Sequence, residues 1–82
     1  MAKDWQKFIL RQPKSWQIKI LAVVEKILLK DLETLDIKKL KGTKHFYRCR
    51  VGKYRIIFKN SEGLIHIKRI DTRGQIYDNL NL

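Results

Sequence analysis

The sequence contains one cysteine, one proline and four glycines among its 82 residues. The lone cysteine, Cys49, excludes an intrachain disulfide and the paired cysteines of zinc sites. No apolar run approaches the roughly 20 residues that a membrane helix needs. The opening "MAKDWQKFIL" lacks the apolar stretch and the cleavage site of a signal peptide. We therefore expect a cytoplasmic protein that does not associate with membranes.

Acidic residues are also scarce, and this imbalance is the strongest signal in the composition. Nineteen Lys and Arg face eight Asp and Glu, which gives a net charge of +11. Residues 38–73 hold twelve of the basic residues and two acidic ones, whereas residues 1–37 hold seven and five. A positive field this concentrated attracts polyanions, and nucleic acid is the usual one. The alternative is a soluble basic surface that has no specific ligand.

The hydrophobic share of 44% is typical of a globular chain, and the length predicts one domain over residues 1–82. Apolar residues at i, i+3 and i+4 predict a short helix over about residues 3–11, which Pro13 ends. A longer helix is predicted from residue 14 or 15 to residue 29 or 30. Its apolar stripe within residues 16–28 is broader than one sheet contact requires. Part of it packs on the first helix, and the remainder is either core or an exposed groove for a partner.

The second half has the alternation and the turn residues of an antiparallel meander. Strands are predicted over about residues 45–51, 54–59 and 64–70, and residues 75–80 can add a short final strand. The mostly polar segment 30–44 is predicted to be an ordered connector with a helical turn, ending at Gly42. The fold class is therefore α+β, with an N-terminal helical hairpin packed on one face of a three- to four-stranded antiparallel sheet and the other face open.

Alternation along these strands separates apolar side chains from basic ones. The set predicted to share the open face comprises Phe46, Arg48, Arg50, Arg55, Ile57, Lys59, His66 and Lys68. Like charges on neighbouring strands repel. Their clustering therefore favours a phosphate-binding surface, where a planar guanidinium can engage two oxygens at once. Phe46 and Tyr77 can stack on bases, and the alternatives are a partly buried edge aromatic and a core tyrosine, respectively.

Residues for conventional acid–base or metal catalysis are few. His45 and His66 are the only histidines, and a surface or turn role is favoured for each because nothing in their spacing brings them together. Asp71 and Asp78 are better explained by turn capping than by two-metal chemistry. We expect no metal and no small-molecule cofactor. A metal-free ribonuclease built from Arg, Lys and Tyr remains chemically feasible, because crowded cations lower one another's pKa and arginines stabilise a pentacoordinate phosphate.

Three segments, "KLKG" at residues 39–42, "YRCRVGKYRIIFK" at 47–59 and "IDTRGQIY" at 70–77, resemble the RelE/ParE superfamily of toxins from type II toxin–antitoxin pairs. The resemblance covers about residues 3–78. RelE-like members cleave mRNA on the ribosome by attack of a 2′-OH on the adjacent phosphate, whereas ParE-like members inhibit DNA gyrase. The resemblance implies a RelE-like toxin that inhibits translation as an mRNA endoribonuclease. The alternatives are a ParE-like gyrase inhibitor and a non-catalytic RNA- or DNA-binding module.

The same resemblance implies roles for residues at matching positions. The implied catalytic set is Arg48, Arg50, Arg55, Arg73 and Tyr77. Arg55 and Arg73 would stabilise the transition state and protonate or shield the leaving oxygen, and Tyr77 would orient the reacting nucleotide. The RNA-binding set is Lys41, Lys44, Lys53, Lys59 and Lys68. Arg48 and Arg50 stand where RelE itself has lysines. If one of those lysines serves as the base, Lys41, Lys44 or Lys53 is expected to take over that role here. The implied partners are a cognate antitoxin, the ribosome and mRNA.

Overall fold

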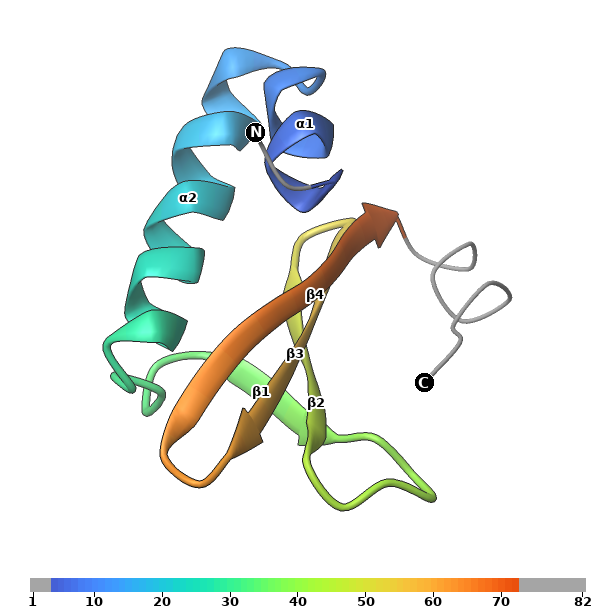
Figure 1. Cartoon of the computed structure of the whole chain (residues 1–82). Coiled ribbons are helices and arrows are strands. Elements are labelled where there is room, and N and C mark those ends of the chain that lie inside the picture. Colours follow the sequence, from blue (N-terminus) through green and yellow to red (C-terminus); the bar gives the residue numbers. More distant parts are fainter. Residues whose placement is uncertain (1–3, 73–82) are drawn as a thin grey trace.

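A computed structural model describes residues 4–72 of the chain, which form two helices and one four-stranded antiparallel sheet. The elements are α1 (Asp4–Leu10), α2 (Lys14–Leu28), β1 (Asp36–Lys39), β2 (Phe46–Val51), β3 (Tyr54–Ser61) and β4 (Leu64–Thr72). The strands follow chain order across the sheet, β1-β2-β3-β4. Figure 1 shows the two helices lying together beside the sheet. The α+β class and the helical hairpin predicted from the sequence are confirmed. Neither helix is long and apolar enough to cross a membrane.

The turn between the helices is organised by Pro13 and two glutamines. The carbonyl of Pro13 accepts hydrogen bonds from the backbone N–H groups of Trp16 and Gln17, at 2.9 and 3.0 Å, and so begins α2. The side-chain amide of Gln17 donates to the carbonyl of Gln12 at 2.8 Å. These bonds satisfy polar groups that a helix end leaves unpaired, which explains why the break falls where the proline predicts.

The core lies between the helical hairpin and the sheet. It comprises Ile9, Ile20, Val24 and Ile27 from the helices and Cys49, Tyr54, Ile56, Phe58, Ile67 and Ile70 from the strands. In β3 the core residues Tyr54, Ile56 and Phe58 alternate with Arg55 and Ile57, as the pleat of a strand requires. The expected assignment of the apolar set to the helix-covered face is therefore correct.

The segment predicted as a connector contains a strand that the sequence pattern did not indicate. β1 pairs antiparallel with β2, and Ile37 lies opposite Cys49. The prediction was wrong because β1 has four residues, of which one is apolar, so its alternation cannot be recognised locally. β1 supplies the fourth strand of the described sheet. The predicted strand at residues 75–80 lies outside the described residues.

β4 contains an irregularity that changes which side chains share a face. Ile57 pairs with Arg69 and Phe58 pairs with Ile67, so Lys68 is the extra residue of a β-bulge. The strict alternation expected for this strand therefore fails after Ile67. Arg69, and not Lys68, takes the place opposite Ile57.

An aromatic cluster joins the helices to the β2–β3 turn. The Tyr54 hydroxyl donates to Oε1 of Gln12 at 2.8 Å. The Tyr54 ring packs edge-on against Phe8 and Trp16, with centroids 5.9 and 5.2 Å away. Gly52, in the adjoining turn, has a φ of 58°. A Cβ there would overlap Cη2 of Trp16 and lie 2.8 Å from its Cζ3. Gly52 is therefore required both by the backbone and by the packed indole.

The substitution Gly52→Ala should destabilise the protein more than Gly42→Ala, which serves as the matched control. Both glycines have a positive φ, but a Cβ at Gly42 meets no atom within 4 Å. We expect a loss of about 1 kcal/mol for Gly42→Ala from the left-handed backbone alone. The loss for Gly52→Ala should reach about 3 kcal/mol because Trp16 must also move. Urea unfolding measures both, and equal losses would contradict the Trp16 contact.

Candidate functional site

The face of the sheet opposite the helices carries a grid of charged side chains. We call it the basic face, and strand register arranges it in rows. The first row is Asp36, Arg50, Arg55 and Asp71; the second is Lys38, Arg48, Ile57 and Arg69; the third is Phe46, Lys59 and His66. Directly opposed residues of antiparallel strands share a face. The structure therefore brings together Arg48, Arg50 and Arg55, as predicted.

The first row places Arg50 directly opposite Arg55. Arg50 is exposed, whereas Arg55 is only 5% exposed. Nη1 of Arg55 donates to the backbone carbonyls of Tyr54 and Gly52 at 3.2 and 3.4 Å. The expectation of a fully open face is thus wrong for Arg55, and also for Ile57, which is completely buried. Both lie on β3, an interior strand with neighbours on either side, and Arg55 folds back onto the adjoining turn.

The second row contains a guanidinium with an unsatisfied nitrogen. The Arg48 side chain is 18% exposed, and its Nη1 lies 4.0 Å from Oδ1 of Asp36, the outer limit for an ion pair. This Nη1 is buried and has no hydrogen-bond partner among the described residues. Such a group carries a desolvation cost that an incoming anionic oxygen would relieve. Arg48 is therefore a candidate anion-binding residue of the basic face.

The basic face also contains two carboxylates that the predicted open-face set did not include. Asp36 and Asp71 stand at the two ends of the first row. Asp71 accepts a hydrogen bond from the backbone N–H of Thr72 at 2.8 Å. They moderate the repulsion between Arg50 and Arg55 without matching the number of cations.

The remaining predicted residues are dispersed. Lys41 and Lys44 are exposed in the connection between β1 and β2. Lys53 is exposed at the β2–β3 turn, and its Nζ lies 5.4 Å from the ring centroid of Tyr54, a residue of the helix-covered face. Lys59 is on the basic face, and Lys68 is exposed at the bulge. Arg73 and Tyr77 lie outside the described residues.

Four members of the basic face were missed by sequence reasoning. Asp36 and Lys38 were missed because β1 was not recognised as a strand, Arg69 because of the bulge, and Asp71 because it was assigned to a turn. A signal for Arg69 was present. In "IHIKRI", two basic residues separate Ile67 from Ile70, and both isoleucines are buried. Two apolar positions three residues apart in a strand indicate an extra residue between them.

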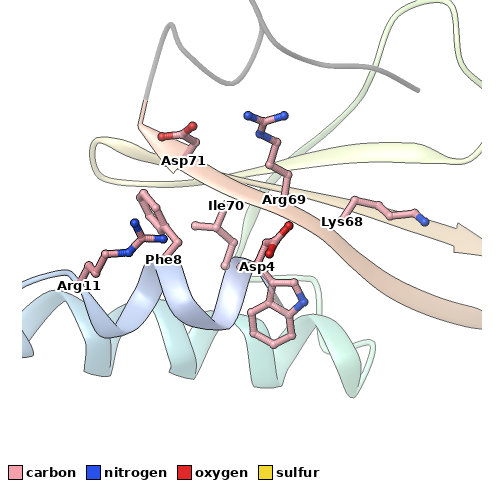
Figure 2. Close-up of a pocket in the computed structure, with 8 residues that line it drawn as sticks. Asp4, Phe8, Arg11, Lys68, Arg69, Ile70 and Asp71 are labelled. Atoms are coloured by element: carbon pink, nitrogen blue, oxygen red, sulfur yellow. The ribbon is translucent and has the colours of Figure 1, made fainter. Parts of the chain in front are cut away.

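A pocket lies between α1 and β4 (Figure 2). It has a volume of about 290 Å³, and its described lining is Asp4, Trp5, Phe8, Arg11, Lys68, Arg69, Ile70 and Asp71. Arg48, Arg50 and Arg55 do not line it. Its lining holds three basic and two acidic side chains, of which Arg69 and Asp71 also belong to the basic face. We therefore place the candidate site on the basic face.

Metal-binding potential is low in the part of the chain that the structure describes. No three His, Cys, Asp or Glu side chains there lie close enough together to hold a metal ion. The chemistry open to these residues is recognition of an anion and stabilisation of negative charge by guanidinium groups.

Cys49 lies behind the basic face, in the core. Burial, reinforced by the nearby Asp36 carboxylate, raises the pKa of the Cys49 thiol to about 11, although the positive charge of Arg48 opposes the shift. A thiol held in its neutral form is a poor nucleophile. Cys49 is therefore a packing residue.

Comparison with known proteins assigns the family. A sequence model described as "ParE toxin of type II toxin-antitoxin system, parDE" matches residues 2–77. The chain is 37% identical over 81 residues to "Toxin RelE3" of Methanocaldococcus jannaschii, covering 94% of this chain and 91% of that protein. It is also similar to a crystal structure of the RelB-RelE antitoxin-toxin complex from Methanococcus jannaschii. The TM-score is 0.79 and the identity 32%, covering 98% of this chain and 96% of that one.

The chain therefore belongs to the RelE/ParE superfamily and is a toxin of a type II toxin–antitoxin system. The resemblance inferred from the sequence motifs is confirmed, as is the fold that it implied. These relatives do not assign a reaction to the basic face.

The raised pKa of Cys49 predicts a pH dependence of stability. The folded protein retains the thiol proton more firmly than the unfolded chain, so this contribution is fully present below about pH 9. It is lost as the pH rises toward 11. We expect the loss to be on the order of 2 kcal/mol. Urea unfolding of the native protein and of Cys49→Val between pH 8 and 10.5 isolates the effect, because the other titrating groups are common to both. Parallel curves would contradict burial of the thiol.

Proposed function

We propose that this toxin is a metal-independent endoribonuclease that cleaves mRNA on the ribosome and so inhibits translation. The observation that carries the proposal is the buried Nη1 of Arg48, which lacks a hydrogen bond, on the same face as Arg50 and Arg55. Register gathers three arginine residues on one face of β2 and β3, an arrangement that suits a phosphate. The membership in a superfamily that includes RelE toxins supports the same reading.

The reaction requires only the RNA and groups that stabilise charge. The 2′-oxygen of one nucleotide attacks the adjacent phosphorus and loses its proton. The bond from phosphorus to the 5′-oxygen of the next nucleotide breaks, and that oxygen gains a proton. The products are a 2′,3′-cyclic phosphate and a 5′-hydroxyl end. Between them lies a pentacoordinate phosphorus with additional negative charge, which Arg48 and Arg50 would stabilise by charge-assisted hydrogen bonds.

The guanidinium groups do not serve as the base, because arginine keeps its proton at neutral pH. In this proposal Arg55 has a structural role beneath the phosphate site, because it is buried and its Nη1 already donates hydrogen bonds to backbone carbonyls. Arg73 and Tyr77 would act on the leaving oxygen and on the reacting nucleotide, as the superfamily resemblance implies. The ribosome would present the mRNA in the bent geometry that in-line attack needs.

A second candidate function is inhibition of DNA gyrase. It is favoured by one observation, the match of residues 2–77 to a ParE toxin model. Gyrase inhibition would use the basic face for protein or DNA contact and would need no reaction at phosphorus. A supercoiling assay with purified toxin separates the two functions, because only the gyrase inhibitor acts without ribosomes.

The proposed function includes an antitoxin partner, as in the RelB-RelE complex that this chain resembles. The outer side of the helical hairpin offers a surface for it. Large apolar side chains are exposed there, namely Leu10, Ile18, Leu21, Leu28 and Leu29. Residues 18, 21 and 28 follow a helical repeat on the side of α2 away from the core, which suits the apolar stripe of a partner helix. An acidic partner would also be attracted by the net charge of +11.

Loss of Arg50 should reduce cleavage without unfolding the protein, because this side chain is exposed. We expect Arg50→Ala to lower the rate of mRNA cleavage about 100-fold. Arg11→Ala, which removes an exposed arginine of the helical hairpin, should keep the native rate. Inducible expression followed by mapping of new 5′-hydroxyl ends measures both. Growth arrest by the native toxin without new mRNA ends would refute the nuclease proposal.

A charge placed in the apolar stripe of α2 should weaken antitoxin binding. Leu21→Glu introduces a negative charge at an exposed position, 48% accessible, so the fold should tolerate it. We expect at least a 10-fold loss of affinity for the product of a short acidic reading frame next to the toxin gene. Lys26→Glu, on the same helix but outside the stripe, is the control for charge. Calorimetry measures the affinities, and equal losses for the two variants would exclude this surface.

A further inference from the structure

Phe46 is an aromatic residue that the core does not use. It is half-buried, and its ring is not among the partly buried hydrophobic side chains that pack against the core. Its neighbour Tyr47 points to the opposite face and stacks on Phe58, with centroids 5.6 Å apart and planes at 18°. The packing requirement at this end of β2 is therefore met by Tyr47, and the ring of Phe46 stands on the basic face.

The surroundings of Phe46 are basic and accessible. Register places Lys59 beside it and His66 beyond Lys59, in the third row of the basic face. Nζ of Lys59 lies 5.9 Å from the centroid of the Phe46 ring, near the outer limit of a cation–π contact. A contact at that distance on an accessible surface contributes less than about 1 kcal/mol, so it does not by itself explain an aromatic residue here. A partly exposed ring beside a lysine is an arrangement by which proteins stack bases of single-stranded nucleic acid.

We propose that Phe46, with Lys59 and His66 beside it, is a stacking platform for a nucleobase of the RNA that the arginines hold. This inference rests on the proposed function and adds a second point of contact to it. Phe46, Arg48 and Arg50 alternate along β2 and share one face. From Phe46 to Arg50 the strand rises about 13 Å. The stacked base therefore belongs to a nucleotide roughly two positions from the reacting phosphate in an extended single strand.

In this proposal the arginines of the basic face act on the phosphate, and Phe46 recognises a base. Arg48 and Arg50 contact the phosphate, whose charge is the same at every nucleotide. Stacking on Phe46 depends on the size and the π surface of the base, so it favours purines over pyrimidines. Lys59 adds contact with the backbone phosphate of the stacked nucleotide and so contributes affinity without base preference.

Binding of a short oligonucleotide that cannot be cleaved tests the platform separately from the reaction. The probe is a fluorescent single-stranded RNA with 2′-O-methyl groups, which removes the attacking hydroxyl. It is used intact and with an abasic nucleotide placed at successive positions. Fluorescence anisotropy at low ionic strength gives the dissociation constants. Phe46→Leu removes the ring and keeps an apolar side chain, and Phe46→Trp enlarges the π surface.

We expect Phe46→Leu to weaken binding of the intact probe about 10-fold and Phe46→Trp to preserve or strengthen it. With the abasic nucleotide at the stacked position, the native protein and Phe46→Leu should bind equally. The dependence of log affinity on log salt should be unchanged by Phe46→Leu, whereas Lys59→Met should lower its slope by about 0.7. Ile18→Ala, which removes an exposed apolar side chain from α2, should change neither quantity.

Three results would overturn the platform. They are native affinity in Phe46→Leu, an equal loss of affinity for the intact and the abasic probes, and no binding of the probe by the native protein. A fall in the melting temperature of Phe46→Leu without a change in affinity would assign Phe46 to stability alone. Because the probe is not cleaved, these results are independent of whether the toxin proves to be a nuclease.

Discussion

The packing of Tyr54 against the helical hairpin determines which face of the sheet is available for binding. Its hydroxyl donates to Gln12 in the turn between the helices, and its ring contacts Phe8 and Trp16, one from each helix. Gly52 allows the indole of Trp16 to lie directly against the β2–β3 turn. With the hairpin held against this face, alternation directs Arg48, Arg50 and Arg55 to the other. The contacts that stabilise the core therefore also decide where the cations gather.

The basic face shows a conflict between stability and binding. Arg55 and Arg48 are largely withdrawn from water, and each carries a charge that burial penalises. Arg55 recovers part of that cost through two backbone carbonyls, whereas Nη1 of Arg48 has no hydrogen bond in the described part of the chain. Asp36 and Asp71 reduce the repulsion along the first row. In the proposed function, guanidinium groups held in place before a phosphate arrives would lose little free energy to reorganisation when it binds.

The extent to which the sequence predicted the site differs from strand to strand. Alternation in β2 and β3 correctly assigned Arg48, Arg50 and Arg55 to one face, because both strands are long and their apolar positions are regular. The same reasoning missed Asp36, since β1 has four residues and is stabilised by pairing with β2. The expected alternation placed Lys68 on the basic face, whereas Arg69 lies there, because a bulge moves every later side chain to the opposite face. It also treated Arg55 and Ile57 as open, although both are buried on β3, where side chains of β2 and β4 flank them.

Composition and local pattern alone determined the α+β class, the helical hairpin broken at Pro13, the concentration of positive charge in residues 38–73 and the superfamily motifs. These properties depend on residues close together in the chain, whose periodicity follows from backbone geometry. Only the tertiary structure decided that Asp36 joins the basic face, that Arg69 replaces Lys68, and that Nη1 of Arg48 is buried 4.0 Å from a carboxylate. Those features depend on register between strands and on burial, which arise from contacts between distant residues. Of the three, only the bulge left a local signal, the three-residue spacing of Ile67 and Ile70.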